Sequence, residues 1–224
     1  MLIQLDFSAV LSSWPLLVRG VVWTIGLTVV GTVLGLLLGS ACAWARARNL
    51  GPRALPLRWA VAAYVELVRN TPFIVQLFFL FFGLPALGLK LSPEVASVLA
   101  MVINLGAYSA EIIRAGVEAT PRGQIEAALS LAMNRAQIFI RVVLPPALRK
   151  VWPALVSQII IVMLGSAVCG QISTPELSYA ANLISSNTFR AFEAFILATL
   201  AYLALSMLAR RLLIWVGARF LVGR

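Results

Sequence analysis

The sequence predicts an all-α integral membrane protein with five transmembrane helices. Of its 224 residues, 61% are apolar and only 12% are charged, whereas soluble domains carry about 45–50% apolar and about 25% charged residues. A soluble fold of this length has too little interior to hide so much apolar surface. The apolar residues also form long charge-free runs, and a helix needs about 20 mainly apolar residues to cross a bilayer. These observations exclude a water-soluble enzyme.

Five segments have the length and composition of transmembrane helices. The first and fourth follow the longest charge-free runs, at 20–45 and 151–175. The second is read from the charge-free run 70–89, extended backwards to Trp59, and the third and fifth have shorter charge-free centres with ionisable residues near their ends. We expect a short N-terminal segment at 1–16, spans at about 18–45, 59–84, 94–114, 150–172 and 190–215, and a long loop at 115–149.

Lys and Arg residues are divided unevenly between the two sides of these spans. The chain has 18 Lys and Arg against 8 Asp and Glu, a net charge of +10. One side would carry only Arg19, Lys90 and Arg190, and the other the remaining 15 of the 18. Because cytoplasmic loops carry the excess of Lys and Arg, we expect the N-terminus outside, the C-terminus in the cytoplasm and loop 115–149 on the cytoplasmic side. The cations flank apolar runs, which favours membrane lipid over nucleic acid as a partner.

The composition excludes several kinds of chemistry. The chain has no His, and its only two cysteines are Cys42 and Cys169, which are too few for a thiolate cage or a disulfide framework. No Gly-x-x-x-x-Gly-Lys-Ser/Thr loop occurs to cradle phosphate. We therefore predict no metal site, no cofactor bound by this chain and no enzymatic activity of its own. Any ATP hydrolysis would belong to another chain.

Loop 115–149 carries the most informative motif. Thr120-Pro121 predicts a helix start, with the hydroxyl as the cap and the proline at the first helical position. The helix would present Glu126 beside the small Ala127 and Ala128, so that another surface can approach closely and a cation can pair with the carboxylate. Pro145-Pro146 predicts that this helical pattern stops before the fourth span. From the residues alone, an interfacial loop without a partner explains the motif equally well.

Polar side chains inside the spans are candidates for a substrate pathway, because polar groups are costly in a membrane and by default suggest a pathway. In the third span, Asn104, Tyr108 and Glu111 recur on one helical face. Buried polar side chains also often serve only to hydrogen-bond between packed helices, and this structural role is the alternative for each of them. The pathway candidates are Gln76, Asn104, Tyr108, Gln158 and Ser166.

Other residues in the spans are predicted to be structural or to act as a hinge. Glu66 and Arg69 are spaced to pair near the inner interface. Pro72 removes a backbone hydrogen bond from the second span and predicts a bend that can flex. Glu111 and Arg114, at the end of the third span, are assigned the same structural role. Small residues spaced for close helix packing occur in the first span at Gly26, Gly31, Gly35 and Gly39.

These motifs together resemble those of the membrane subunits of ATP-binding-cassette (ABC) importers. That family carries a cytoplasmic Glu-Ala-Ala-x-x-x-Gly followed by Ile-x-Leu-Pro. The chain is most similar to its polar amino-acid branch, the permeases of histidine, glutamine, glutamate, arginine and opine importers. Further matching segments are 64–72, 76–79, 83–85, 107–114 and 188–193. The loop residues that match the motif spacing are Glu126, Ala127, Ala128, Ala132, Val142, Leu144 and Pro145.

The chain departs from the family pattern at Ala132, where relatives have glycine. A glycine there would permit a left-handed turn, which alanine adopts only at a cost. Asn134 tolerates that conformation better, and we expect that it takes over the turn. A second departure is Leu164-Gly165-Ser166-Ala167 in the fourth span, where many relatives have charged or hydroxyl-bearing residues.

The resemblance implies a type I ABC importer permease fold and a function in a bacterial cytoplasmic membrane. The chain would be the permease subunit of an ATP-driven importer that moves a polar or charged amino acid by alternating access. Two cytoplasmic ABC ATPase subunits would bind ATP and Mg²⁺, and a second permease subunit, identical or a sister chain, would complete the route. A periplasmic or lipid-anchored amino-acid-binding protein would deliver cargo to loops 85–94 and 173–190. The residues implied in ATPase coupling are Gly123, Gln124, Glu126, Ala127, Ala128, Ala132, Leu144 and Pro145.

Two alternatives keep the membrane fold but change the function. The permease could carry another small solute, such as methionine or an inorganic anion. A stand-alone channel or secondary transporter would instead conduct without any ATPase. An integral-membrane enzyme is disfavoured, because the sequence offers no convergent acid–base set.

Overall fold

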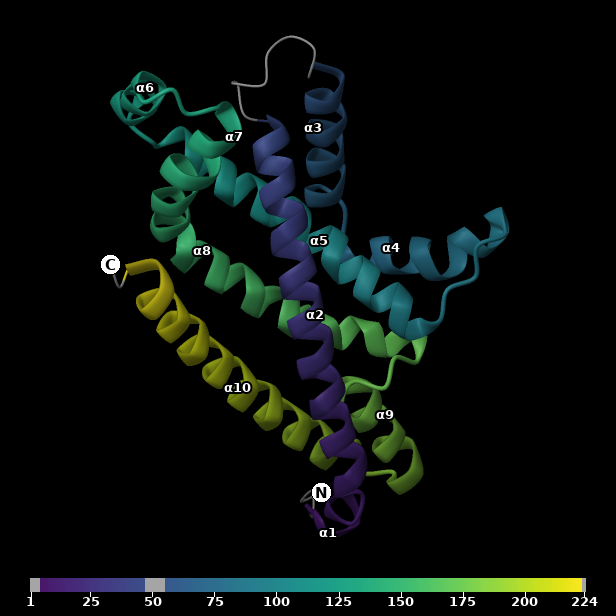
Figure 1. Ribbon diagram of the computed structural model, residues 1–224. Helices are drawn as coiled ribbons and strands as arrows, with labels where there is room; N and C mark the ends of the chain where they lie inside the picture. The colour runs from purple at the N-terminus through teal and green to yellow at the C-terminus, as the bar shows by residue number, and fades with distance from the viewer. Residues whose placement is uncertain (1–4, 47–54, 223–224) are drawn as a thin grey trace. The chain divides into compact units, whose positions relative to one another are not determined.

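The computed structural model describes residues 5–46 and 55–222, and every regular element in these ranges is helical (Figure 1). Four helical stretches are long and apolar enough to cross a membrane, and a fifth is added if two neighbouring helices separated by a break count as one span. The prediction of an all-α membrane fold is therefore confirmed. The long helices are α2 (Trp14–Arg46), α5 (Pro93–Glu118), α8 (Leu144–Gly165) and α10 (Ala191–Val216).

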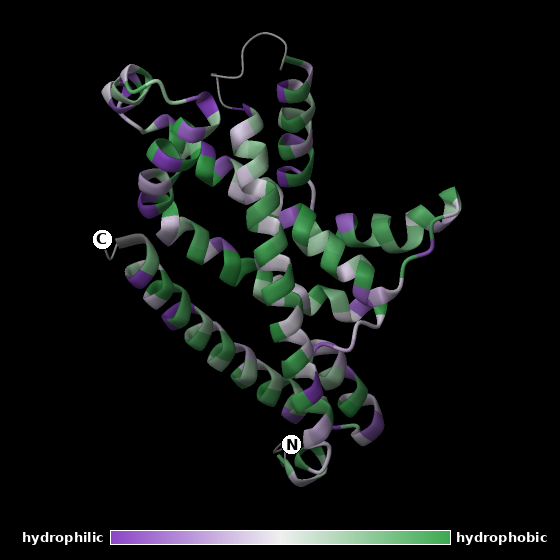
Figure 2. Cartoon of the chain, in the orientation of Figure 1, coloured by the Kyte–Doolittle hydropathy of each residue, from purple (hydrophilic) through white to green (hydrophobic). Residues whose placement is uncertain are grey.

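The long helices present apolar side chains outward. Val22, Leu37 and Leu208 are each about 60% exposed, and Figure 2 shows hydrophobic residues along most of α2 and α10. In water such a surface would associate or aggregate. Lipid tails or another membrane subunit can cover this surface, so that its apolar side chains are not exposed to water.

The chain divides into two compact units, each assembled from three separate stretches. Helices α2, α5, α8 and α10 each contribute one part to both units. The first unit consists of Met1–Gly31, Phe73–Met101 and Ile160–Ala209, and the second of Thr32–Pro72, Val102–Ile159 and Arg210–Arg224.

The two units differ sharply in charge. The first contains three cations and four anions, a net charge of −1, and its cations are Arg19, Lys90 and Arg190. The second contains the other 15 cations and four anions, a net charge of +11. The division that the spans predicted for the two membrane sides thus coincides with the division into compact units.

The N-terminal segment is attached to the start of the last long helix within the first unit. The short helix α1 (Ser8–Leu11) precedes α2. The Asp6 amide donates to the Glu193 carboxylate at 3.0 Å, and the Arg190 guanidinium lies 3.9 Å from the Asp6 carboxylate. Hydrogen bonds from Ser8 lower the pKa of the Asp6 carboxyl from its usual value. Of the predicted segment 1–16, residues 1–4 lie outside the described residues.

The predicted second span is interrupted at Pro72, where we expected a bend. Helix α3 (Leu55–Arg69) ends before the proline and α4 (Phe73–Phe78) begins after it. Pro72 has no N–H to donate to Val68 and would clash with its carbonyl. The Thr71 hydroxyl instead donates to the Leu67 carbonyl at 2.9 Å. The chain then continues as a π-helix (Phe79–Gly83) and a 3-10 helix (Leu84–Leu87).

The fourth span is continuous with the second half of loop 115–149, contrary to prediction. Helix α7 (Arg135–Gln137) passes into a π-helix (Ile138–Val143) and then directly into α8. Pro145-Pro146 therefore does not end the helix. The two prolines lie in the first turn of α8, directly after the π-helix. A 3-10 helix (Ser166–Ile172) extends α8 at its other end.

Segment 173–190, which we expect from the sequence to be a loop, contains a helix. Helix α9 (Leu177–Thr188) is capped by Glu176, whose carboxylate accepts from the Ser178 amide at 2.9 Å and the Tyr179 amide at 2.7 Å. The Tyr202 hydroxyl also donates to this carboxylate. Burial raises the pKa of the Glu176 carboxyl, and these hydrogen bonds oppose the rise. Glutamate is not a favoured cap, so the sequence carried no clear signal for this helix.

Helices α2 and α5 approach closely at three of the four glycines that were predicted to serve close packing. A methyl group at Gly31 would lie 3.2 Å from the Met101 Cβ, and one at Gly35 would lie 2.9 Å from the Leu105 Cβ. At Gly39 the methyl group would meet the Ala110 backbone nitrogen at 2.9 Å. Gly26 has no heavy atom within 4 Å of such a group, so the packing role predicted for it is wrong.

We predict that Gly39→Ala lowers the thermal stability of the purified protein, whereas Gly26→Ala does not. The added methyl at position 39 meets backbone, so α2 and α5 must separate at a cost of about 1–3 kcal/mol. At position 26 the methyl enters open space and alanine improves helix propensity by up to about 1 kcal/mol. Melting temperatures of the two variants in detergent would check this. Equal shifts would contradict the close approach at Gly39.

Candidate functional site

Residues 115–149, called the Glu-Ala-Ala segment below, fold around a small core of their own in the second unit. Helix α6 (Arg122–Ser130) packs on α7 and the following π-helix. Figure 2 shows hydrophilic residues in α6 and α7, but the faces turned toward one another are apolar. The buried centre of this core is formed by Ala128, Ile138, Phe139 and Val143, and the residues around it are Val117, Ile125, Met133, Val142 and Leu144.

Helix α6 starts one residue later than predicted. Its N-cap is Pro121, with φ −59° and ψ 132°, and no side chain caps the helix. Thr120 is therefore not the cap. Proline has no N–H, and its fixed φ suits the extended backbone that precedes a helix.

Helix α6 ends in a Schellman motif at Ala132. Ala132 has φ 54°; its amide donates to the Leu129 carbonyl at 2.9 Å and the Met133 amide to the Ala128 carbonyl at 3.3 Å. These are the two hydrogen bonds that define the motif. The left-handed turn thus falls on the alanine that occupies the glycine position of the resembling motif. The expectation that Asn134 takes over this turn is wrong.

Asn134 instead caps the next helix. Its backbone is extended, its side chain accepts from the Gln137 amide, and the Gln137 side chain accepts from the Asn134 amide, each at 2.9 Å. This is a capping box. A residue in this role needs an extended backbone, so it cannot also adopt the left-handed turn.

The structure separates the exposed residues of the Glu-Ala-Ala motif from the buried one. Glu126 and Ala127 are exposed on α6, as are Gly123 and Gln124, whereas Ala128 faces the core and is 4% exposed. Leu144 and Pro145 are half-buried at the start of α8, and Leu144 packs against the core. One face of α6 therefore anchors the helix, and the other presents a carboxylate beside a small side chain.

The polar face of α5 contacts α3 within the second unit. The Tyr108 hydroxyl donates to the Arg69 carbonyl at 3.4 Å, and the Arg69 guanidinium lies 5.6 Å from the centre of the Tyr108 ring. Asn104 is buried. The predicted ion pair between Glu66 and Arg69 is absent from the described residues. The Glu66 carboxylate accepts from the Asn70 amide group at 2.9 Å instead.

Glu111 is the centre of an ion-pair network at the end of α5. It accepts from Arg46 at 3.1 Å and from Arg114 at 2.5 Å, and Arg114 also pairs with Glu118 at 2.6 Å. All four side chains are at least partly exposed. The ion pairs lie at the end of α5, beyond its most apolar part. Arg46 was not singled out from the sequence, because its partner is far away in the chain.

The remaining pathway candidates are divided between the two units. Gln76 and Ser166 belong to the first unit, and Gln158 belongs to the second with Asn104 and Tyr108. Gln76 and Gln158 are half-buried. Ser166 is fully buried and its hydroxyl donates to the Met163 carbonyl at 2.6 Å, which is the hydrogen bond of a structural serine. A common pathway for these residues stays a prediction.

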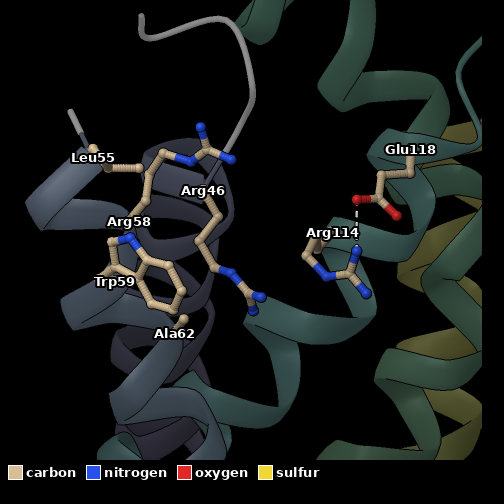
Figure 3. Close-up of a pocket in the computed structure, with 7 residues that line it drawn as sticks. All are labelled: Arg46, Leu55, Arg58, Trp59, Ala62, Arg114 and Glu118. Atoms are coloured by element: carbon tan, nitrogen blue, oxygen red, sulfur yellow. Dashed lines mark ion pairs between the residues drawn. The ribbon is translucent and has the colours of Figure 1, made fainter. Parts of the chain in front are cut away.

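A cavity of about 280 Å³ opens in the second unit beside the ion-pair network (Figure 3). It lies among the end of α2, the start of α3 and the end of α5. The sequence pointed to this region only through its excess of cations. The cavity is lined by Arg46, Leu55, Arg58, Trp59, Ala62, Arg114 and Glu118.

Comparison with known proteins identifies a family and close relatives. Residues 31–222 match the family described as "Binding-protein-dependent transport system inner membrane component". The chain is 37% identical over 166 residues to the L-cystine transport system permease protein TcyB of Bacillus subtilis, covering 74% of this chain and 69% of that protein. It is 34% identical over 215 residues to the glutamine transport system permease protein GlnP of Escherichia coli, covering 93% and 96%.

Solved structures share the fold. A chain from the crystal structure of an amino acid ABC transporter with histidines has a TM-score of 0.85 and 32% identity, and the match covers 97% of this chain and all of that one. The MetNI methionine ABC transporter in an inward-facing conformation has a TM-score of 0.72 and 24% identity over 93% of this chain and 95% of that one. The second likeness is one of fold alone.

We predict that Ala132→Gly stabilises the protein by about 1 kcal/mol, because glycine adopts the left-handed conformation without the steric penalty of a Cβ, although it adds entropy to the unfolded chain. Ala127→Gly is the matched control, since the same change in the middle of α6 should destabilise by about 1 kcal/mol. Thermal unfolding of both variants would measure the difference. A lower melting temperature for Ala132→Gly would contradict the Schellman assignment.

Proposed function

The chain belongs to the family of binding-protein-dependent transport system inner membrane components, and we propose that it carries a polar or charged amino acid as the permease subunit of an ATP-driven importer. It is a multi-pass membrane protein of this family. The substrate class is supported by relatives named for cystine and glutamine transport. The observation that carries the coupling role is the exposed Glu126–Ala127 face on a helix held by its own core.

We infer that the Glu-Ala-Ala segment transmits force from an ATPase to the spans. Its core includes Val117 from the end of α5 and Val142 and Leu144 next to or within the start of α8. Because a packed core moves as one body, a displacement of α6 is passed to both helices. An ATPase that grips Glu126 can therefore pull on α5 and α8 together. The segment acts as a lever, and no covalent chemistry is assigned to this chain.

The proposed complex contains several partners. Two ABC ATPase subunits bind ATP and Mg²⁺ and grip α6 from the cytoplasm. A second permease subunit, identical or a sister chain, completes the route through the bacterial cytoplasmic membrane. An amino-acid-binding protein, periplasmic or lipid-anchored, docks on segments 85–94 and 173–190. Transport requires the ligand's free energy to differ between outward-facing and inward-facing states, and ATP binding and hydrolysis on the partner subunits supply the bias.

The proposed orientation is supported by the charge of the two units. The second unit carries 15 of the 18 cations and contains the Glu-Ala-Ala segment. The excess of Lys and Arg favours the cytoplasmic side. We therefore propose that the second unit, which contains the Glu-Ala-Ala segment, faces the cytoplasm.

We predict that Glu126→Lys abolishes coupling while the protein still folds and inserts. Reversal of the charge removes a charge-assisted contact worth about 1.5–3 kcal/mol, so ATP-driven uptake and stimulated ATP hydrolysis should both fall by about tenfold or more. The measurement is uptake of labelled glutamine, cystine, arginine and methionine by proteoliposomes that contain the permease, its ATPase and its binding protein. Methionine uptake alone would favour the alternative solute class.

Glu66→Lys is the control for this experiment, because it makes the same exchange on an exposed carboxylate of α3 in the same unit. Uptake should survive in that variant. Unchanged uptake in Glu126→Lys would refute the coupling role. Flux through liposomes that contain the permease without its ATPase would instead favour a channel or secondary transporter.

The orientation predicts opposite accessibility for two exposed serines. Ser92 precedes α5 in the first unit and Ser130 ends α6 in the second. In intact cells a membrane-impermeant maleimide should label Ser92→Cys, and it should reach Ser130→Cys only after permeabilisation. The two native cysteines, Cys42 and Cys169, are buried and serve as the unlabelled background. Labelling of Ser130→Cys in intact cells would reverse the topology.

A further inference from the structure

We propose that the cavity among α2, α3 and α5 binds the phosphate-bearing headgroup of an anionic glycerophospholipid from the cytoplasmic leaflet. The ligand chemistry is a phosphate ester with an apolar tail. The inference goes beyond the transport function and depends only on the proposed orientation. All seven lining residues belong to the second unit.

Three arginines line the cavity. Figure 3 shows Arg46 and Arg58 on one side of the gap and Arg114 on the other. Arginine has five N–H donors in a planar fork that matches phosphate oxygens. The volume of about 280 Å³ is roughly nine times the share of liquid volume that one water occupies. The space therefore suits a headgroup phosphate with its ester substituents.

The carboxylates nearby balance the charge of only two of these three cations. Glu111 accepts from both Arg46 and Arg114, and Glu118 pairs with Arg114. Arg46 uses only Nη1 in its contact with Glu111, so within the described part of the chain its other donors remain for a ligand. Among residues 5–46 and 55–222, Arg58 has no carboxylate within 4 Å. Three guanidinium groups thus face two carboxylates, and Arg58 supplies the uncompensated charge.

The rim of the cavity favours a lipid over a soluble phosphate. Trp59 is 70% exposed and Leu55 is 51% exposed, both in the first two turns of α3. Tryptophan is enriched at membrane–water interfaces, where its ring lies at the level of the headgroups. A free phosphate would leave these apolar side chains uncovered, whereas a lipid glycerol and acyl chain can cover them. Basic pockets between transmembrane helices on the cytoplasmic side suit anionic headgroups in this way.

A bound headgroup would connect α3 to the ends of α2 and α5. Arg58 comes from α3, whereas Arg46 and Arg114 are already joined through Glu111. The end of α5 leads directly into the Glu-Ala-Ala segment. The lipid would therefore stabilise the end of the lever that the ATPase is proposed to pull.

The test is lipid binding to the purified transporter complex in zwitterionic micelles, followed by quenching of tryptophan fluorescence. The probes are phosphatidylglycerol and phosphatidylcholine with brominated acyl chains. We expect the wild type to prefer phosphatidylglycerol, and Arg58→Gln to lower that preference by about fivefold, the effect of one cation at an anionic surface. Trp59→Phe should remove the part of the quenching that depends on Arg58. Arg211→Gln, which removes the same charge from an exposed site of the second unit outside the cavity, should leave the preference intact.

Three outcomes would overturn the assignment. An equal effect of Arg58→Gln and Arg211→Gln would mean that charge acts diffusely and not through the cavity. Displacement of phosphatidylglycerol by millimolar inorganic phosphate or glycerol phosphate would assign the cavity to a soluble phosphate. Binding that appears only after the ATPase is removed would assign the surface to the ATPase interface. Because the assay measures no transport, its failure is distinguishable from failure of the proposed importer function.

Discussion

The high cost of placing charges and unpaired backbone groups in hydrocarbon constrains the whole structure. Every regular element in the described residues is helical, because a helix satisfies its own backbone hydrogen bonds in lipid. The charges are displaced from the apolar stretches, and 15 of the 18 cations belong to one compact unit. Where charge meets the end of α5, Glu111 is paired with Arg46 and Arg114. The orientation, the proposed lipid site and the position of the lever all depend on this constraint.

The Glu-Ala-Ala segment combines a rigid scaffold with an exposed contact surface. Ala128 is small because it packs in the core, whereas Ala127 is small and exposed beside Glu126. The Schellman turn at Ala132 and the capping box at Asn134 hold α6 and α7 in place. A surface prepared in this way loses little conformational entropy when a partner binds. The same core joins α6 to α5 and α8, so binding and movement are coupled by packing.

The apolar runs and the charge distribution predicted the helical membrane fold well. The predictions failed where a proline or a side chain has a different local partner from the one that sequence spacing suggests. Pro72 interrupts the second span, because it has no N–H to donate to the Val68 carbonyl, and the Thr71 hydroxyl donates to that carbonyl at 3.5 Å. Pro145-Pro146 lies in the first turn of α8, directly after a π-helix, and does not end the helical path. Spacing predicted an ion pair between Glu66 and Arg69. Instead, the Glu66 carboxylate accepts from Asn70, and the Arg69 guanidinium lies over the Tyr108 ring. The partnership of Arg46 with Glu111 had no local signal at all.

By itself the sequence determined that the protein is surrounded by lipid, that it is helical, how its charges are divided and how its motifs are spaced. These properties follow from composition and from neighbours along the chain. The tertiary structure decided which alanine is buried, which glycines touch α5, and which arginines line a cavity. Those outcomes depend on contacts between segments far apart in the chain. A helix cap at Glu176 is stable because Tyr202 and a buried site support it, and neither is visible in the residues around it.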